Sequence, residues 1–223
     1  MSDAPVSATR LAAQLGDLLP AASSVADESF VLVDRVRELV EAVVMTDVSP
    51  AARAAAAQRI AEVTEALRAE RRGVPLLLVR HPDGRVESLL QAGSGRLNPQ
   101  SPPLEWLHRP TEPPPGSQPA SVEVTARCTF TAAHAGSPGR VHGSVLAGVL
   151  DEVTGIAIRA AGAGGMTVAL NVSLKGGVPI GAVAQIAARY TGGEARKSFA
   201  SGEVTVDGTV VAEASVIYVA ERE

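Results

Sequence analysis

The chain has 223 residues and a formal net charge of −4; hydrophobic residues make up 46% of it and aromatic residues only 3%. This length allows one ordinary domain with an appendage, or two small domains, with a core built from Ala, Val, Leu and Ile. The absence of a basic block argues against nucleic-acid binding, and no apolar run is long enough to span a membrane. The single Cys128 excludes an intrachain disulfide and a CxxC site, so we expect it to be a small buried side chain in a strand. The first residues lack the pattern of a secretory signal, and we expect a cytoplasmic protein.

Residues 1–73 are predicted to be helical. Apolar residues recur at helical spacing between Phe30 and Met45, which indicates one amphipathic helix. Ser49 is a helix cap followed by Pro50, and the alanine-rich run after it predicts a second helix that ends at Gly73. Residues 76–79 and 86–90 flank a Pro-Asp-Gly turn sequence and predict a short strand pair. We assign residues 1–92 to an N-terminal helical extension.

Residues 93–120 are predicted to be a proline-rich connector. Eight of the fifteen prolines lie between residues 99 and 119, which predicts an extended, irregular segment. Trp106 lies within it, and we expect this side chain to anchor the segment. The third region, residues 121–223, follows.

Residues 121–223 are predicted to form an α+β domain. Apolar residues alternate with polar ones from Val122 to Phe130, which is typical of a strand with one buried face. An apolar helix follows from His142 to the glycine-rich run at residues 162–165, and tight turns are predicted at residues 192–193 and 207–208. This order favours one long helix lying across a curved antiparallel sheet. The remaining predicted strands are Met166–Leu174, Val183–Tyr190, Arg196–Val206 and Thr209–Val219.

The predicted helix after His142 carries the candidate chemistry. Gly143 lies at its start, where backbone N–H groups lack partners and glycine lets an anion or a polarised carbonyl approach. Asp151 lies in the middle of the apolar helix, where an acid is costly to desolvate. Residues three and four positions away from Asp151 are small, so either a substrate or closely packed backbone could fill the space beside it. Asp151 is therefore a candidate base or nucleophile, or a structural acid hydrogen-bonded to a strand.

Gly143 and Asp151 are too far apart on one helix to act on one substrate. Eight helical steps separate them by about 12 Å, whereas a reacting carbonyl must lie about 3 Å from its oxyanion donors and close to the attacking group. A two-fold dimer with Gly143 of one subunit facing Asp151 of the other solves this problem and gives two equivalent sites.

These residues resemble the hotdog-fold acyl-coenzyme A thioesterases of the PaaI-like group. The resemblance covers about residues 93–223. It rests on the sequence from Val141 to Ser144, on Asp151 nine residues after the histidine, and on the run from Thr167 to Val172. It is supported by the segments Asn98–Pro103, Gly177–Gly181 and Ala195–Phe199.

The resemblance implies a role for each matching residue. Gly143 matches the backbone oxyanion donor, and Asp151 matches the acid that attacks the thioester or activates water. Thr167 matches a threonine that in some members contacts the reacting water or carboxylate. His142 matches the turn histidine, which we expect to organise the loop. Ser144 replaces a second glycine of the family motif and is a candidate substrate contact.

Other positions depart from the family or concern the leaving group. Gly136 stands where some relatives carry an amide side chain, so the second oxyanion donor is unassigned. Arg196 and Lys197 match a basic pair that could meet coenzyme A phosphates, and Arg140 is a further candidate. Alternatively, these three residues are solvated charges on the surface and bind no ligand.

The resemblance implies hydrolysis of an acyl-CoA or acyl carrier protein thioester by a homodimer or tetramer, without a metal or a cofactor. Two alternatives remain open. A hotdog hydratase or dehydratase would need an acid and a histidine at one double bond. A non-catalytic acyl-thioester-binding or scaffold protein is suggested by the N-terminal extension.

Overall fold

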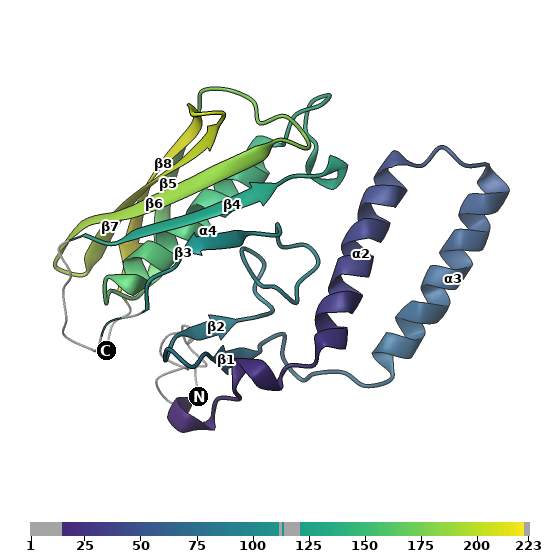
Figure 1. Cartoon of the computed structure of the whole chain (residues 1–223), viewed down its shortest axis with the longest axis horizontal. Coiled ribbons are helices and arrows are strands. Elements are labelled where there is room, and N and C mark those ends of the chain that lie inside the picture. Colours follow the sequence, from purple (N-terminus) through teal and green to yellow (C-terminus); the bar gives the residue numbers. More distant parts are fainter. Residues whose placement is uncertain (1–14, 112, 114–120, 221–223) are drawn as a thin grey trace.

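The computed structural model describes residues 15–111, 113 and 121–220, and it contains one six-stranded antiparallel sheet that curves around a single long helix (Figure 1). The helix is α4 (Gly143–Ala160). Strand order in the sheet is β3-β4-β6-β7-β8-β5, so β3 and β5 form its two edges. The predicted α+β architecture is therefore confirmed. The strands are β3 (Glu105–His108), β4 (Glu123–Thr129), β5 (Met166–Leu174), β6 (Val183–Glu194), β7 (Lys197–Val206) and β8 (Thr209–Val219).

The core lies between α4 and the concave face of the sheet. Alternate residues of β4, β6, β7 and β8 are buried, as a strand with one covered face requires. At Gly202 a Cβ atom would lie 3.0 Å from Thr154 Cγ2 on α4, so the absence of a side chain lets the helix lie close to β7. Cys128 is 2% exposed in β4, which confirms the sequence expectation, and burial raises the pKa of its thiol to about 12.

Two details of the predicted sheet were wrong. The turn between β6 and β7 is formed by Ala195 and Arg196, not by residues 192–193, because Gly192 lies within β6 at a register shift and has φ 132°. That glycine accommodates an irregularity in the ladder, not a hairpin turn. The second departure lies in the connector, where β3 pairs with β4 and adds an edge strand. Trp106 of β3 packs against the main core, as expected for an anchor.

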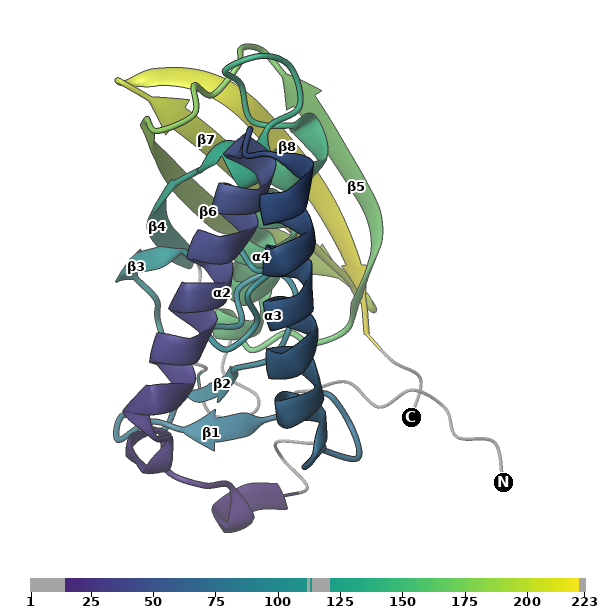
Figure 2. The same cartoon turned by 90° about the vertical axis from the view of Figure 1, so that its right-hand side faces the viewer.

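Two antiparallel helices, α2 (Asp27–Met45) and α3 (Pro50–Arg68), stand beside the sheet domain (Figures 1 and 2). The Ser49 hydroxyl caps α3 and Pro50 is its first residue, as predicted, but the helix ends at Arg68, before Gly73. Short 3-10 helices, η1 (Gly16–Leu18) and η2 (Ala22–Ser24), precede α2; residues 1–14 of the predicted helical region lie outside the described residues. In the part of the chain that is described, no helix is long and apolar enough to cross a membrane.

A small hairpin lies between the helices and the sheet domain. Strands β1 (Leu78–Arg80) and β2 (Val86–Ser88) pair antiparallel, which confirms the predicted strand pair, and Gly84 supplies the positive φ of 85° that the turn requires. Buried side chains of β1, of α2 and of the segment that follows β2 form a second core, separate from the main one. This core consists of Val33, Val79, Leu89 and Leu97.

The small hairpin also contains a buried ionic cluster around Glu87, whose side chain is only 4% exposed. His81 Nε2 lies 2.7 Å from its carboxylate, Arg96 Nε lies 3.2 Å away and the Arg109 guanidinium 3.8 Å away. Burial raises the pKa of Glu87, but the His81 hydrogen bond and the charges of Arg96 and Arg109 outweigh burial and lower it overall. The cluster connects β2 to the residue that follows β3.

Candidate active site

The start of α4 is held by its own cap. The Ser144 backbone N–H donates to His142 Nδ1 at 3.1 Å, and Ser144 Oγ lies 2.6 Å from the same nitrogen. The His142 ring is thus engaged with the first turn of α4. Both side chains are exposed. A Cβ atom at Gly136 would lie 2.7 Å from His142 Cδ2, so packing of this ring accounts for glycine at this position.

Gly143 is the first residue of α4. Its backbone N–H is one of the N-terminal groups that have no acceptor within the helix. A Cβ atom here would lie 2.6 Å from Leu174 Cδ1, at the end of β5, so a larger residue would push against that side chain. The start of α4 thus presents an N–H group without an acceptor in the helix, at a position where only glycine fits beside Leu174.

Asp151 lies near the middle of α4, and its half-buried carboxylate has one specific partner. Thr167 Oγ1 on β5 donates to Asp151 Oδ1 at 2.8 Å. Within the described residues no Lys, Arg or His forms an ion pair with this carboxylate, so it is neither blocked by a salt bridge nor left without a hydrogen bond. The sequence predicted both residues, and the structure brings them together although sixteen positions separate them.

Tyr218 on β8 is a site residue that sequence reasoning missed. It pairs in register with Thr167, the residue that donates to Asp151. Burial raises the pKa of the Tyr218 phenol, the Thr167 hydrogen bond opposes this, and the nearby Asp151 charge raises the pKa further. The pairing of β5 with β8 has no local sequence signal, so nothing in the chain pointed to this tyrosine.

The space predicted beside Asp151 is open on one side only. Gly148, three residues before Asp151, is exposed, and a side chain there would meet no neighbouring atom. Gly155, four residues after it, is covered, because the Tyr218 hydroxyl occupies the space where a Cβ atom would lie. The hydroxyl of buried Thr154 donates back to the carbonyl of Leu150 at 2.8 Å. A substrate can therefore approach the carboxylate from the Gly148 side.

The predicted basic residues lie at two different ends of the site. Lys197 pairs with Val219, next to the pair of Tyr218 and Thr167, and is therefore at the Asp151 end. Arg196 is at the same end, where its Nε donates to the carbonyl of Ala220 at 3.2 Å. Arg140 precedes α4, and its guanidinium donates to the carbonyl of Gly177 at 2.8 Å.

Glu152 connects α4 to the N-terminal region. The Ser94 hydroxyl donates to its carboxylate at 2.9 Å, Gln91 Nε2 also donates to it, and Arg159 Nη2 lies 3.8 Å away. Glu152 is thus paired, and its side chain is 11% exposed. A Cβ atom at Gly93 would lie 2.6 Å from Glu152 Oε2, so glycine is required where this loop crosses the helix.

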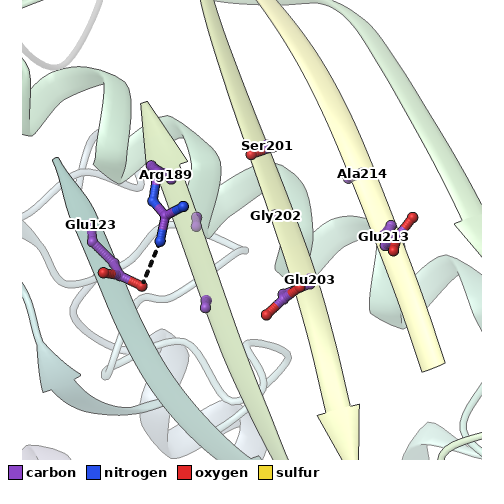
Figure 3. Close-up of a pocket in the computed structure, with 9 residues that line it drawn as sticks. Glu123, Arg189, Ser201, Gly202, Glu203, Glu213 and Ala214 are labelled. Carbon is purple, nitrogen blue, oxygen red and sulfur yellow. Dashed lines mark hydrogen bonds and ion pairs between the residues drawn. The ribbon is translucent and has the colours of Figure 1, made fainter. Parts of the chain in front are cut away.

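A shallow depression on the outer face of the sheet is separate from these residues (Figure 3). Glu203 and Glu213 point into it, and Arg189 forms an ion pair with Glu123 at 3.5 Å. The main-chain layer of β6, β7 and β8 lies between this depression and α4. Its acidic lining does not suit an anionic ligand, and we assign no function to it.

Comparisons with known proteins agree with this architecture. No family model and no curated protein matches the sequence. The crystal structure of a thioesterase superfamily protein matches with a TM-score of 0.72 and 24% identity over 90% of this chain and 97% of that one. A hypothetical thioesterase from Streptococcus pneumoniae with coenzyme A matches with a TM-score of 0.46 and 15% identity, over 54% of this chain and 90% of that one. A putative thioesterase from Ralstonia eutropha, a phenylacetic acid degradation-related protein, has a TM-score of 0.41 and 27% identity over 44% and 76%.

The first of these matches assigns the class of the fold. A single long helix inside a curved antiparallel sheet defines the hotdog fold, and the chain has the hotdog fold of a thioesterase superfamily protein. The expectation drawn from the resemblance is thus confirmed at the level of the fold. That match covers 90% of the chain, whereas residues 93–223 make up 131 of its 223 residues, so the similarity also includes much of the N-terminal region.

Proposed function

We propose that this protein hydrolyses an acyl-CoA thioester to a free acid and coenzyme A. The observation that carries the proposal is the Asp151 carboxylate, half-buried on an apolar helix, free of ion pairs among the described residues and held by Thr167 at 2.8 Å. A carboxylate in such a setting is available to act on a substrate, because no fixed positive charge neutralises it. Hydrolysis also needs a hydrogen-bond donor to the thioester carbonyl oxygen, and the backbone N–H of Gly143 is the candidate donor.

The reaction begins with polarisation of the thioester carbonyl by the Gly143 N–H and the positive end of α4. Asp151 then takes a proton from a water molecule that attacks the carbonyl carbon, or attacks that carbon itself. The carbon–sulfur bond breaks, and the coenzyme A thiolate takes up a proton on leaving. Where Asp151 is the nucleophile, water then hydrolyses the mixed anhydride, which releases the free acid and restores the carboxylate. Thr167, supported by Tyr218, fixes the orientation of the carboxylate during both steps.

One helix cannot supply both groups to one substrate, so the proposal includes a homodimer. The eight helical steps from Gly143 to Asp151 span about 12 Å along the helix axis. A two-fold axis that places α4 of one subunit beside α4 of the other would bring the two groups together twice. The free edge of β5 supports such a pairing, because it exposes apolar side chains that a monomer would leave in water. These are Met166, Val168 and Leu174, which are 52%, 60% and 56% exposed.

The leaving group would be recognised by the basic residues around the site. Lys197 and Arg196 lie at the Asp151 end, where their charges can meet phosphate groups of coenzyme A or of an acyl carrier protein. Arg140 and Ser144 lie near the start of α4 and are further candidates for substrate contact. The proposal favours coenzyme A as the carrier and a cytoplasmic location.

The proposal is tested by release of free thiol from a panel of acyl-CoAs, with Asp151→Asn compared with the wild type. This change preserves shape but removes the base or nucleophile, and we expect turnover to fall by about 100-fold or more. Asp207→Asn is the matched control, because it makes the same chemical change in an exposed turn at φ 49°, a conformation that asparagine tolerates. Unchanged turnover in Asp151→Asn would refute the assignment.

The same panel separates the two alternatives. A hydratase would consume the double bond of crotonyl-CoA without releasing thiol; the distance along α4 between His142 and Asp151 disfavours this function within one subunit. A non-catalytic binding protein would bind acyl-CoA in calorimetry and release no thiol from any member of the panel.

A further inference from the structure

Among the described residues, none covers the apolar side chains of helix α3. Of its nineteen residues only Thr64 is half-buried, and all the others are exposed. Figures 1 and 2 show α3 on the outer side of α2, away from the sheet. In proteins most of the stability of a helix comes from tertiary packing of its amphipathic face, so the exposed apolar residues of α3 are expected to have a partner.

The two helices carry matching apolar stripes. Successive apolar residues of the α2 stripe are four, three and four positions apart, and those of the α3 stripe have the same spacing. Each stripe extends over about 16 Å. This is the spacing of a coiled-coil seam. Six of the eight side chains are between 37% and 58% exposed. The α2 stripe consists of Leu32, Val36, Leu39 and Val43, and the α3 stripe consists of Ala56, Ile60, Val63 and Leu67.

The net charges of the two helices that carry the stripes are complementary to each other. Helix α2 carries five acidic and two basic residues, a net charge of −3, whereas α3 carries three basic and two acidic residues, a net charge of +1. Opposite net charges favour contact between an α2 and an α3 over contact between two copies of the same helix. Within one chain α2 and α3 lie side by side with most of both stripes exposed, so the hairpin itself does not bury them (Figures 1 and 2).

We propose that the α2–α3 hairpin docks on the hairpin of a second copy of this chain, with α2 of each copy against α3 of the other. The arrangement is two-fold symmetric and forms two equivalent seams, which together bury all four stripes. In an antiparallel seam Leu39 of one copy meets Ile60 of the other, and Val43 meets Ala56. The hairpin thereby forms a four-helix interface that is distinct from the sheet edge and from α4, and it stands independently of the proposed catalysis.

The test is disulfide cross-linking between two co-expressed, differently tagged variants, Leu39→Cys and Ile60→Cys. Both positions are exposed, and Cys128 does not interfere because it is buried with a raised pKa. On mild oxidation we expect the monomer bands to be lost to a product that carries both tags. Arg59→Cys, one position away from the α3 stripe, replaces Ile60→Cys in the control and should leave the monomer bands in place.

Three results would overturn the proposal. The first is no cross-link in the folded Leu39→Cys and Ile60→Cys pair. The second is an intramolecular disulfide in a chain that carries both changes, with no disulfide between the two co-expressed variants. The seam would then lie within one chain. The third is absence of the cross-link together with sedimentation of the wild type with phosphatidylserine vesicles, which would assign the stripes to a membrane surface. None of these measurements depends on thiol release, so their outcome is independent of the role proposed for Asp151.

Discussion

The contact between Thr167 and Asp151 is the smallest unit of the proposed chemistry. Thr167→Val keeps the shape and the strand preference of the residue but removes the hydroxyl that donates to the carboxylate at 2.8 Å. We expect kcat/KM for acyl-CoA to fall about tenfold, which corresponds to the loss of one hydrogen bond to a charged group. Thr205→Val in β7 is the control, and equal kinetics in the two variants would show that the hydroxyl does not support the carboxylate.

Glu87 gives a second prediction at the residue scale. Its pKa is lowered in the folded protein, so its contribution to stability is complete above the ordinary value of 4.5 and is lost as the pH falls towards the lowered pKa. Glu87→Gln leaves Arg109 buried without its counter-charge and should cost about 3 kcal/mol at pH 7. Urea unfolding of both proteins at pH 7 and at progressively lower pH measures this. A difference that does not shrink with acidity would contradict the ion-pair explanation.

At the scale of elements, the loop that follows β2 is held on α4 through Glu152. Gly93→Val would place side-chain atoms where Glu152 lies, and so it should detach Gln91 and Ser94 from the helix. We expect a loss of about 2 kcal/mol in the free energy of unfolding and a raised KM, since α4 carries Asp151 on the adjacent position. The control is Gly84→Asn in the β1–β2 turn, where a side chain meets no neighbour and asparagine tolerates the positive φ. Equal stability of the two variants would contradict the role of the loop.

These elements also show what the sequence can and cannot predict. The start of α4 was predictable, because a capping histidine and a glycine before an apolar run are local signals. Strands β5 and β8 were predicted with their observed bounds, since their apolar and polar residues alternate. Tyr218 and the partners of Glu152 were not predictable, because contacts between segments about 50 to 60 residues apart leave no periodic trace. Gly192 was misassigned because a glycine pair signals a bulge as readily as a turn.

At the scale of the whole molecule, the catalytic proposal depends on two copies. Gly143 and Asp151 are fixed on one rigid helix, so a single subunit cannot bring both to one carbonyl. The proposed hairpin interface would add a second contact to the same pair or join pairs into a tetramer. In either case the hotdog domains must provide the shared sites, since only they carry α4.

The most direct measurement of this claim is complementation between two inactive variants. Asp151→Asn removes the acid, and Gly143→Val fills the space at the helix start, where even a Cβ atom would lie 2.6 Å from Leu174 Cδ1. Mixed dimers of the two, purified by separate tags, contain one site with both changes and one site with neither if the site is shared. We predict that they recover about half of the wild-type turnover, while each parent stays inactive. Mixed dimers as inactive as their parents would contradict a site built across the two-fold axis.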